Sequence, residues 1–314
     1  MKIERIIPTK LSKIDAINYI KILATEHNFD VQNIKYLGGG SFGMAFLINT
    51  NKDSFVIKFL RANDMLDNEI ASLNILSKNC STSFPTVLFS RTSDSKIPLD
   101  LYAMTLVKGK NAFLSFGFLL SSKRKRLNFA DDVTTSLHDI HEVKNNKFGN
   151  ILEHTYDSWL DYYKEFAFAV LEKARELNNH NELKNNIMQA MENAWSKFDI
   201  IFSEKVTDAC LIHGDLNVSN IFINKGKLSG FIDPLNTMYA DKEYDLFQFD
   251  NLTGKRFKLS ETYINKYGSS KYCKEKLAFY GLWNEVYCYI KSGALFNIIM
   301  NPLVKNMNKV VKSL

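Results

Sequence analysis

The alternation of apolar and polar positions divides the chain into a strand-rich first third and a helical remainder. Residues 13–28 carry apolar side chains at near-helical spacing, which predicts a leading helix. Short apolar runs bounded by turn residues then predict an amino-terminal sheet of five strands. These runs are the two flanks of a glycine cluster within 34–48, and residues 54–60, 84–89 and 101–107. A second helix is expected from about residue 64 to residue 78.

Beyond residue 111 the periodicity is helical. The segments with helical spacing are residues 129–142, 156–178 and 182–203, a segment that starts at 261, and residues 274–300. A chain of 314 residues is long for one compact unit, so two lobes are expected. The sequence predicts an α+β protein, with an antiparallel sheet and a helix in residues 1–107 and a mainly helical lobe in residues 108–314. Lys108-Gly109-Lys110 is the expected crossing point.

The charge of the chain does not change the predicted fold. The formal net charge of +6 comes from dispersed lysines, and the densest basic run, Lys123-Arg124-Lys125-Arg126, fits a solvated helix start or loop. No aromatic residues interleave with that run, so neither nucleic acid nor a membrane is an expected partner. The chain opens on no apolar signal region, which favours a cytoplasmic protein. We expect a monomer or a weak homodimer.

The possible metal ligands are scattered. Four cysteines lie far apart and are expected to be reduced, mostly buried thiols, without zinc or disulfides. His138 and His141 fall on one expected helix, but no third ligand type lies at metal spacing. These histidines are interpreted as structural or solvated.

One stretch has the spacing that phosphoryl transfer requires. Asp215 follows His213 and Gly214, Asn220 comes five residues later, and Asp233 comes thirteen residues after that. A carboxylate to orient and deprotonate an attacking hydroxyl, and two oxygen ligands for Mg²⁺, are the groups that this chemistry needs. The neighbouring apolar residues predict short buried strands, so the polar groups lie at strand ends. A solvated turn rich in Asp and Asn is the alternative.

Glycines cluster between two of the expected strands. Gly38, Gly40 and Gly43 match the spacing G-x-G-x-x-G, with Ser41 and Phe42 between them. Because a strand follows and not a helix, the motif does not fit a dinucleotide-binding fold. A flap between strands suits backbone amides that approach nucleotide phosphates. A glycine-rich hairpin without a ligand would give the same pattern.

Two charged residues interrupt apolar runs in the same lobe. Lys58 lies in the strand after the glycine cluster, where it is expected to reach the α- and β-phosphates of a nucleotide; an edge-strand lysine is the alternative. Glu69 lies among the apolar positions of the next helix and is expected to pair with Lys58, because a partly buried carboxylate needs a partner. Main-chain groups from Thr105 to Val107 are candidates for binding an adenine edge.

The order of these features resembles the protein-kinase-like fold, from the glycine flap through Lys58, Glu69 and His-Gly-Asp215-x4-Asn220 to Ile-Asp233. Within that fold the chain resembles the aminoglycoside phosphotransferase family of small-molecule kinases, which includes fructosamine-kinase-like members. The resemblance extends from about residue 36 to residue 249. It implies ATP and Mg²⁺ as cofactors, Asp215 as catalytic base and Asn220 and Asp233 as metal ligands.

Departures from protein kinases narrow the expected substrate. Gly214 stands where many protein kinases have an arginine that pairs with a phosphorylated loop, and Pro234-Leu235 replaces Phe-Gly. Regulation by such a loop is therefore not expected. The dipeptide Asp233-Pro234 resembles fructosamine kinases, in which Asp-Pro occurs. Asp245 matches a family aspartate that braces the catalytic loop backbone.

The expected activity is transfer of the γ-phosphoryl of ATP to a hydroxyl of a small molecule, aminoglycoside-like or another amino or sugar metabolite. A ketosamine kinase is the alternative, followed by a protein kinase or a non-catalytic nucleotide-binding protein. The acceptor is expected against the helices of 156–203 and 274–300. The side chains considered for a cationic acceptor are Asp241, Glu243 and Glu285, with Trp283 and Tyr287 as aromatic contacts for which core packing is the preferred interpretation.

Overall fold

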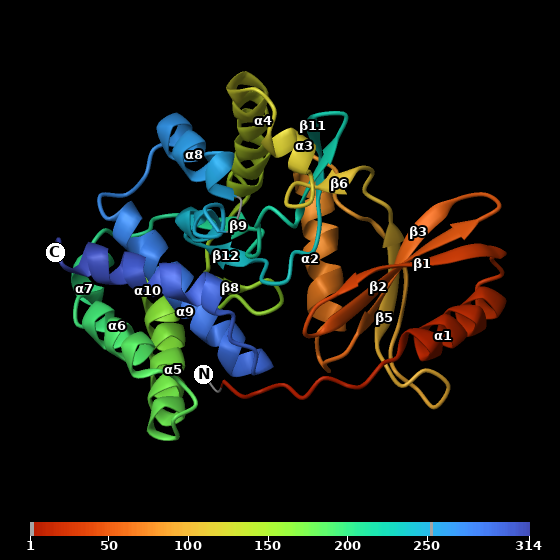
Figure 1. The fold of residues 1–314 in the computed structure, drawn as a ribbon, viewed down its shortest axis with the longest axis horizontal. Helices are drawn as coiled ribbons and strands as arrows, with labels where there is room; N and C mark the ends of the chain where they lie inside the picture. The colour runs from red at the N-terminus through yellow and green to blue at the C-terminus, as the bar shows by residue number, and fades with distance from the viewer. Residues whose placement is uncertain (1–2, 252–253) are drawn as a thin grey trace.

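The computed structural model describes residues 3–251 and 254–314. A five-stranded sheet lies at one end of the molecule and most of the helices lie at the other (Figure 1). The sheet end holds five antiparallel strands in the order β1-β2-β3-β5-β4 and two helices. These elements are α1 (Lys13–Glu26), β1 (Val31–Gly39), β2 (Gly43–Thr50), β3 (Ser54–Leu60), α2 (Leu66–Asn79), β4 (Val87–Arg91) and β5 (Leu101–Thr105).

Strand β3 lies inside the sheet, and both of its faces are covered. Phe55, Ile57 and Phe59 pack in one core with α1, whereas Leu60 packs in another with α2. Because side chains alternate between the faces of a strand, Lys58 points to the same side as Leu60, toward α2. The strand period therefore places this lysine beside Glu69.

The other end of the molecule is mainly helical. Its helices are α3 (Phe116–Leu119), α4 (Lys123–His141), α5 (Trp159–Asn179), α6 (Asn185–Trp195), α7 (Phe198–Ile201), α8 (Leu259–Tyr267), α9 (Cys273–Ser292) and α10 (Asn297–Val311), with short 3-10 helices η1 (Lys242–Leu246) and η2 (Gly254–Arg256). No helix within 3–251 and 254–314 combines the length and the apolarity that crossing a membrane requires.

Two small sheets lie between these helices and the large sheet. One has the order β11-β10-β6 and the other the order β7-β9-β12-β8. Their strands are β6 (Lys110–Asn111), β7 (Lys144–Asn145), β8 (Gly149–Asn150), β9 (Ala209–Ile212), β10 (Ile221–Asn224), β11 (Lys227–Phe231) and β12 (Met238–Ala240). The candidate catalytic loop follows β9, and Asp233 follows β11, so both small sheets present their polar groups at strand ends as expected.

An aromatic core holds the helical end together. Trp159 and Tyr163 of α5 pack against Tyr244 and against Phe279 and Tyr280 of α9. The indole N–H of Trp159 donates to the Tyr280 hydroxyl at 2.9 Å, so this ring buries no unsatisfied donor. The packing places α5 and α9 side by side.

The expected α+β architecture is confirmed, and so are the five strands and the leading helix. The basic run at 123–126 begins α4, where Ser122 accepts a hydrogen bond from the Lys125 N–H, as a helix start requires. The single helix expected over 274–300 is wrong. Gly293, with φ +73°, ends α9, and α10 begins at residue 297. The helix expected over 182–203 is likewise two helices, α6 and α7. The boundary between residues 107 and 108 stays a prediction.

Candidate active site

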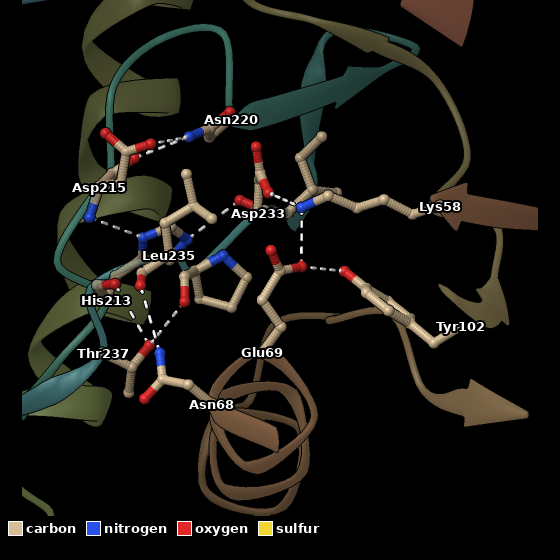
Figure 2. A network of polar contacts seen from close by, with 12 residues as sticks. Lys58, Asn68, Glu69, Tyr102, His213, Asp215, Asn220, Asp233, Leu235 and Thr237 are labelled. Atoms are coloured by element: carbon tan, nitrogen blue, oxygen red, sulfur yellow. Dashed lines mark hydrogen bonds and ion pairs between the residues drawn. The ribbon is translucent and has the colours of Figure 1, made fainter. Parts of the chain in front are cut away.

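An ion-pair network joins the two ends of the molecule (Figure 2). Lys58 Nζ lies 2.7 Å from Glu69 Oε2 and 2.6 Å from Asp233 Oδ1. Burial alone would lower the pKa of Lys58, but the charges of Asp233 and Glu69 outweigh it and raise the pKa well above its ordinary value. Lys58 is therefore a permanent cation at this site. The expected Lys58–Glu69 pair is confirmed.

Tyr102 belongs to the same network, although no sequence motif predicts a role for it. Its hydroxyl donates to Glu69 Oε2 at 2.6 Å, the same oxygen that accepts from Lys58, while Glu69 Oε1 is buried and has no hydrogen-bond partner among the described residues. Lys58 and Tyr102 are paired across β3 and β5. Directly paired residues on adjacent strands share a face of the sheet, so this pairing is the feature that could have identified Tyr102 as a neighbour of Lys58.

The glycine flap (residues 38–43) closes over this lysine. Gly40 N–H donates to Gly43 O at 3.1 Å and closes the turn between β1 and β2. A β-carbon on Gly43 would lie 3.0 Å from Lys58 Cε, tighter than ordinary van der Waals contact. Glycine at this position thus lets the lysine stem pass beneath the flap. Ser41 at the tip is exposed, and Phe42 O accepts from the Arg61 N–H at 2.7 Å.

Asp245 holds the candidate catalytic loop, as expected. It is 1% exposed and accepts main-chain hydrogen bonds from His213 at 2.8 Å and from Gly214 at 2.7 Å. His141 Nε2 also lies 3.2 Å from this carboxylate, and His141 Nδ1 lies 2.6 Å from the Tyr263 hydroxyl. The structural interpretation of His141 is confirmed. Asp245 lies in η1, a 3-10 helix of residues Lys242–Leu246.

His213 joins the two loops that carry the candidate catalytic groups. Burial is the largest influence on its side chain and lowers the pKa, so the ring is neutral. A neutral imidazole has one donor and one acceptor. Here Nδ1 accepts from the Asp215 N–H at 3.2 Å, so Nε2 carries the proton and donates to Ile232 O at 3.1 Å. His213 thus ties Asp215 to the residue before Asp233.

Asp215 is held by amide side chains. Asn220 Nδ2 donates to its main-chain oxygen at 2.7 Å and lies 3.2 Å from Oδ2, while Asn217 Nδ2 lies 3.3 Å from Oδ1. Burial, then the charge of Asp233, raises the pKa of Asp215 to about 7, although these amides and Gln248 act to lower it. A carboxylate with this pKa is half ionised at neutral pH and suits proton transfer.

The expected magnesium ligands offer a suitable oxygen set. Asn220 turns its amide nitrogen to Asp215, and no hydrogen bond to its Oδ1 is found within the described residues. Asp233 uses only Oδ1 on Lys58 and has φ +60°, a conformation that few residues other than glycine adopt. Carboxylate and amide oxygens are the ligands that Mg²⁺ prefers. The residues present therefore fit the ion, and their role stays a prediction.

The segment expected to bind the adenine edge, residues 105–107, begins at the last residue of β5. Thr105 N–H donates to Thr86 O at 2.9 Å, so this donor is already used. Val107 is buried, and its main-chain groups form no hydrogen bond among residues 3–251 and 254–314. Of the two positions, Val107 has the groups that are free to bind a nucleotide base.

Two of the three carboxylates expected to bind a cationic acceptor are used within the protein. Asp241 and Glu243 are 3% and 2% exposed, and Lys276 Nζ lies 2.5 Å from the first and 2.7 Å from the second. Their assignment as acceptor ligands is wrong, because both are buried and share an ion pair with the same buried lysine. Trp283 is fully buried and stacks on Phe279, so core packing is confirmed for this ring.

Glu285 and Tyr287 remain partly exposed on α9. Burial alone raises the pKa of Glu285 to about 7, and no cation pairs with this carboxylate in the described part of the chain. The ring of Tyr287 packs edge-on against Phe166 of α5 at 5.3 Å between centroids. Glu285 is the expected acceptor carboxylate that the protein itself leaves uncompensated.

Comparison with solved structures defines the class. A thermostable mutant of the aminoglycoside phosphotransferase APH(4)-Ia aligns with a TM-score of 0.69 at 14% identity, over 93% of this chain and 98% of that one. A candidate fructosamine-3-kinase from Thermobifida fusca YX-ER1 gives a TM-score of 0.68 at 15% identity, over 93% and 99% of the two chains. The expected protein-kinase-like fold of small-molecule kinases is confirmed.

The family follows from the sequence itself. The fructosamine kinase family model matches residues 14–307, so the chain belongs to the fructosamine kinase family, whose members are phosphotransferases. The aminoglycoside 3'-phosphotransferase of Enterococcus faecalis is also similar, with 46% identity over 50 residues. That match covers 16% of this chain and about a fifth (19%) of the relative, so by itself it transfers neither activity nor substrate.

Proposed function

We propose that this protein transfers the γ-phosphoryl group of ATP to a hydroxyl of a small amino- or sugar-bearing molecule. The observation that carries the proposal is the network in which Lys58 joins Glu69 and Asp233, with Asp215 held nearby through His213 and Asn220. These are the groups that position a nucleotide and an attacking hydroxyl in phosphoryl transfer. Family membership supports the same reaction.

Lys58 would hold the phosphates, and Glu69 would keep its ammonium group in place. The stem of Lys58 passes under Gly43, so the flap amides and the lysine would contact the phosphates from adjacent positions. Asn220 and Asp233 would hold Mg²⁺, which when bound supplies positive charge to the phosphate oxygens. Solved relatives in complex with ADP and AMP-PNP support nucleotide binding by this fold.

Asp215 would orient the acceptor hydroxyl and take its proton. Its carboxylate is fixed by side-chain amides, and its main chain is fixed through His213 and Asp245. Such preorganisation lowers the barrier, because the charged group needs little rearrangement when the hydroxyl attacks.

A ketosamine is the first acceptor candidate, since the chain belongs to the fructosamine kinase family. An aminoglycoside is the second, because an APH(4)-Ia mutant of the same fold binds ADP and hygromycin B together. Both acceptor classes carry amino groups. Glu285 on α9, which pairs with no cation in the described part of the chain, suits an amino group. A protein substrate is disfavoured, because Gly214 leaves no anchor for a phosphorylated loop.

The test is a coupled ADP-release assay with MgATP across ketosamines, aminoglycosides, choline, homoserine and methylthioribose, beside generic protein substrates. Product phosphorylation is confirmed by mass spectrometry. We expect one amine-bearing class to be phosphorylated and proteins not to be. Phosphorylation of proteins alone, or MgATP binding with no turnover on any acceptor, would overturn the proposal.

A further inference from the structure

Residues 3–12 cross between the two ends of the molecule. Ile3 is 8% exposed and belongs to the core of the helical end, whereas Leu11 is 9% exposed and packs with α1 in the core of the sheet end. In Figure 1 this segment runs from beside α9 to the start of α1 as a chain without regular structure. We call residues 3–12 the strap, because both of its ends are buried in different cores.

Hydrogen bonds hold the strap at two intermediate points. Ile6 N–H donates to Lys291 O at 2.9 Å, in the last turn of α9. Three residues later, Thr9 N–H donates to Arg61 O at 2.7 Å, and Arg61 Nε donates back to Thr9 O at 2.9 Å. The strap is therefore bonded to α9 on one side and to the residue that follows β3 on the other.

Arg61 also holds the glycine flap. Its main-chain N–H donates to Phe42 O at the flap tip, at 2.7 Å. One residue thus contacts the strap through its carbonyl and guanidinium groups and contacts the flap through its amide. Hydrogen bonds, together with the main chain from Ile6 to Thr9, thus form a series of links from α9 through Arg61 to Phe42.

The α9 end of this series lies on the helix that carries the proposed acceptor carboxylate. Glu285 and Lys291 both belong to α9 and are six residues apart, so they lie within two helical turns of each other. Glu285 is the carboxylate proposed above to bind the amino group of an acceptor.

We propose that the strap couples α9 to the glycine flap, with Arg61 as a positioning residue for Phe42. The inference rests on the proposed function in one respect, namely that the flap holds the nucleotide. An acceptor bound against α9 then favours the flap position that holds nucleotide, and nucleotide favours acceptor binding by the same factor, since coupling between two sites is reciprocal. The strap would be a second crossing of the main chain between the two ends of the molecule, beside the expected crossing at Lys108-Gly109-Lys110.

Two substitutions break the series at different points. Ile6→Pro removes the N–H that donates to Lys291 O, and Arg61→Met removes the guanidinium while keeping an unbranched stem. Ile7→Pro is the matched control for the first. It places the same ring one residue later, where the side chain is 89% exposed and the N–H has no hydrogen bond in the part of the chain that the structure describes.

The measurements are amide hydrogen exchange of residues 36–46 in the nucleotide-free protein, and the Kd for MgAMP-PNP by calorimetry. We expect faster flap exchange and an approximately fivefold weaker Kd in Ile6→Pro and Arg61→Met, at the lower end of usual coupling strengths, with Ile7→Pro unchanged. Thermal melting identifies any variant that fails to fold. If one of the two variants does not fold, the other tests the coupling.

Unchanged flap exchange and Kd in a folded Ile6→Pro or Arg61→Met, with faster exchange confined to residues 3–12, would overturn the coupling. Failure of the proposed function looks different. In that case the unmodified protein does not bind MgAMP-PNP, while flap exchange in its nucleotide-free form still reports on the strap.

Discussion

Lys58 and Asp233 are 175 residues apart in the sequence, yet Nζ of the first donates to Oδ1 of the second at 2.6 Å. The lysine thereby neutralises the carboxylate proposed to bind Mg²⁺. Among the described residues the lysine engages only Oδ1, so Oδ2 is the carboxylate oxygen left for the metal. Glu69 can retain the lysine when Asp233 turns to the metal, because its Oε2 lies 2.7 Å from the same ammonium group.

Replacing Lys58 tests the nucleotide half of the proposal. Lys58→Met removes the buried cation and leaves Glu69 and Asp233 unpaired. We expect kcat/KM for ATP to fall by about 10- to 100-fold, the range for loss of a charged hydrogen bond. Steady-state kinetics at varied ATP measure it. Lys52→Met, at an exposed position of the same sheet end, is the control; equal losses in both variants would contradict the role of Lys58.

Asp215→Asn tests the chemical step. The amide cannot accept the acceptor proton, so turnover should fall by about 10²- to 10⁴-fold, as for loss of a general base. Affinity for MgAMP-PNP should stay near that of the unmodified protein, because Asp215 is not assigned to the phosphates. A variant that retains most of its turnover would remove Asp215 from the mechanism.

Tyr102→Phe removes one hydroxyl and nothing else. Glu69 then loses a 2.6 Å hydrogen bond and is held by Lys58 alone. One such bond contributes about 1 kcal/mol, so KM for ATP should rise roughly fivefold while kcat changes little. Steady-state kinetics at varied ATP measure KM and kcat of the variant and of the unmodified protein. Equal ATP dependence in the two proteins would show that Lys58 needs no support from Tyr102.

Gly214 should tolerate no side chain. Its φ is +79°, and an added β-carbon would lie 2.0 Å from Asn236 O. Gly268 is a matched control, with φ +76° and no atom within 4 Å of the added carbon. We expect Gly268→Ala to cost about 1 to 2 kcal/mol of unfolding free energy through backbone strain, and Gly214→Ala to cost more and abolish activity. Denaturant unfolding measures both, and similar losses in the two variants would contradict the clash.

Glu285→Gln should change stability in a pH-dependent way. The pKa of this carboxyl is about 7 in the folded protein, above its ordinary value of 4.5, so the folded state binds the proton more tightly. Stability from this group is present below pH 4.5 and is lost as the pH rises through 7. The variant should therefore be more stable by about 1 to 2 kcal/mol at pH 8 and equally stable near pH 4.5.

Denaturant unfolding at the two pH values measures that difference. Glu153→Gln, at an exposed position, should show no such dependence. The same Glu285 variant should also raise KM for an amine-bearing acceptor more than KM for ATP. A stability gain that is equal at both pH values would rule out titration of Glu285 as the cause.

Most residues of the candidate site could be predicted from short sequence segments, because within each segment these residues lie at fixed spacings. The period of β3 places Lys58 toward α2, and Glu69 follows in the first turn of that helix. Tyr102 was missed because its role depends on the pairing of β3 with β5, which no single segment reveals. Asp241 and Glu243 were misassigned because Lys276, which pairs with both, comes from a helix 35 and 33 residues later in the chain.

The helix break at residues 293–296 shows a different limit. The apolar spacing continues through this region, and only the left-handed conformation of Gly293 ends α9. A single glycine is compatible with a continuing helix, so periodicity alone favours the longer element. The tertiary packing of α10 on α9 decides between the two conformations.

The contact between Gly214 and Asn236 also limits how this enzyme can be redesigned. A phosphate-operated switch of the kind found in many protein kinases would need an arginine at position 214, and the neighbouring carbonyl leaves no room for even a methyl group. Installing one would require rebuilding the turn at residues 234–237 first. The route from this scaffold to a phosphorylation-controlled kinase therefore has no single-substitution first step.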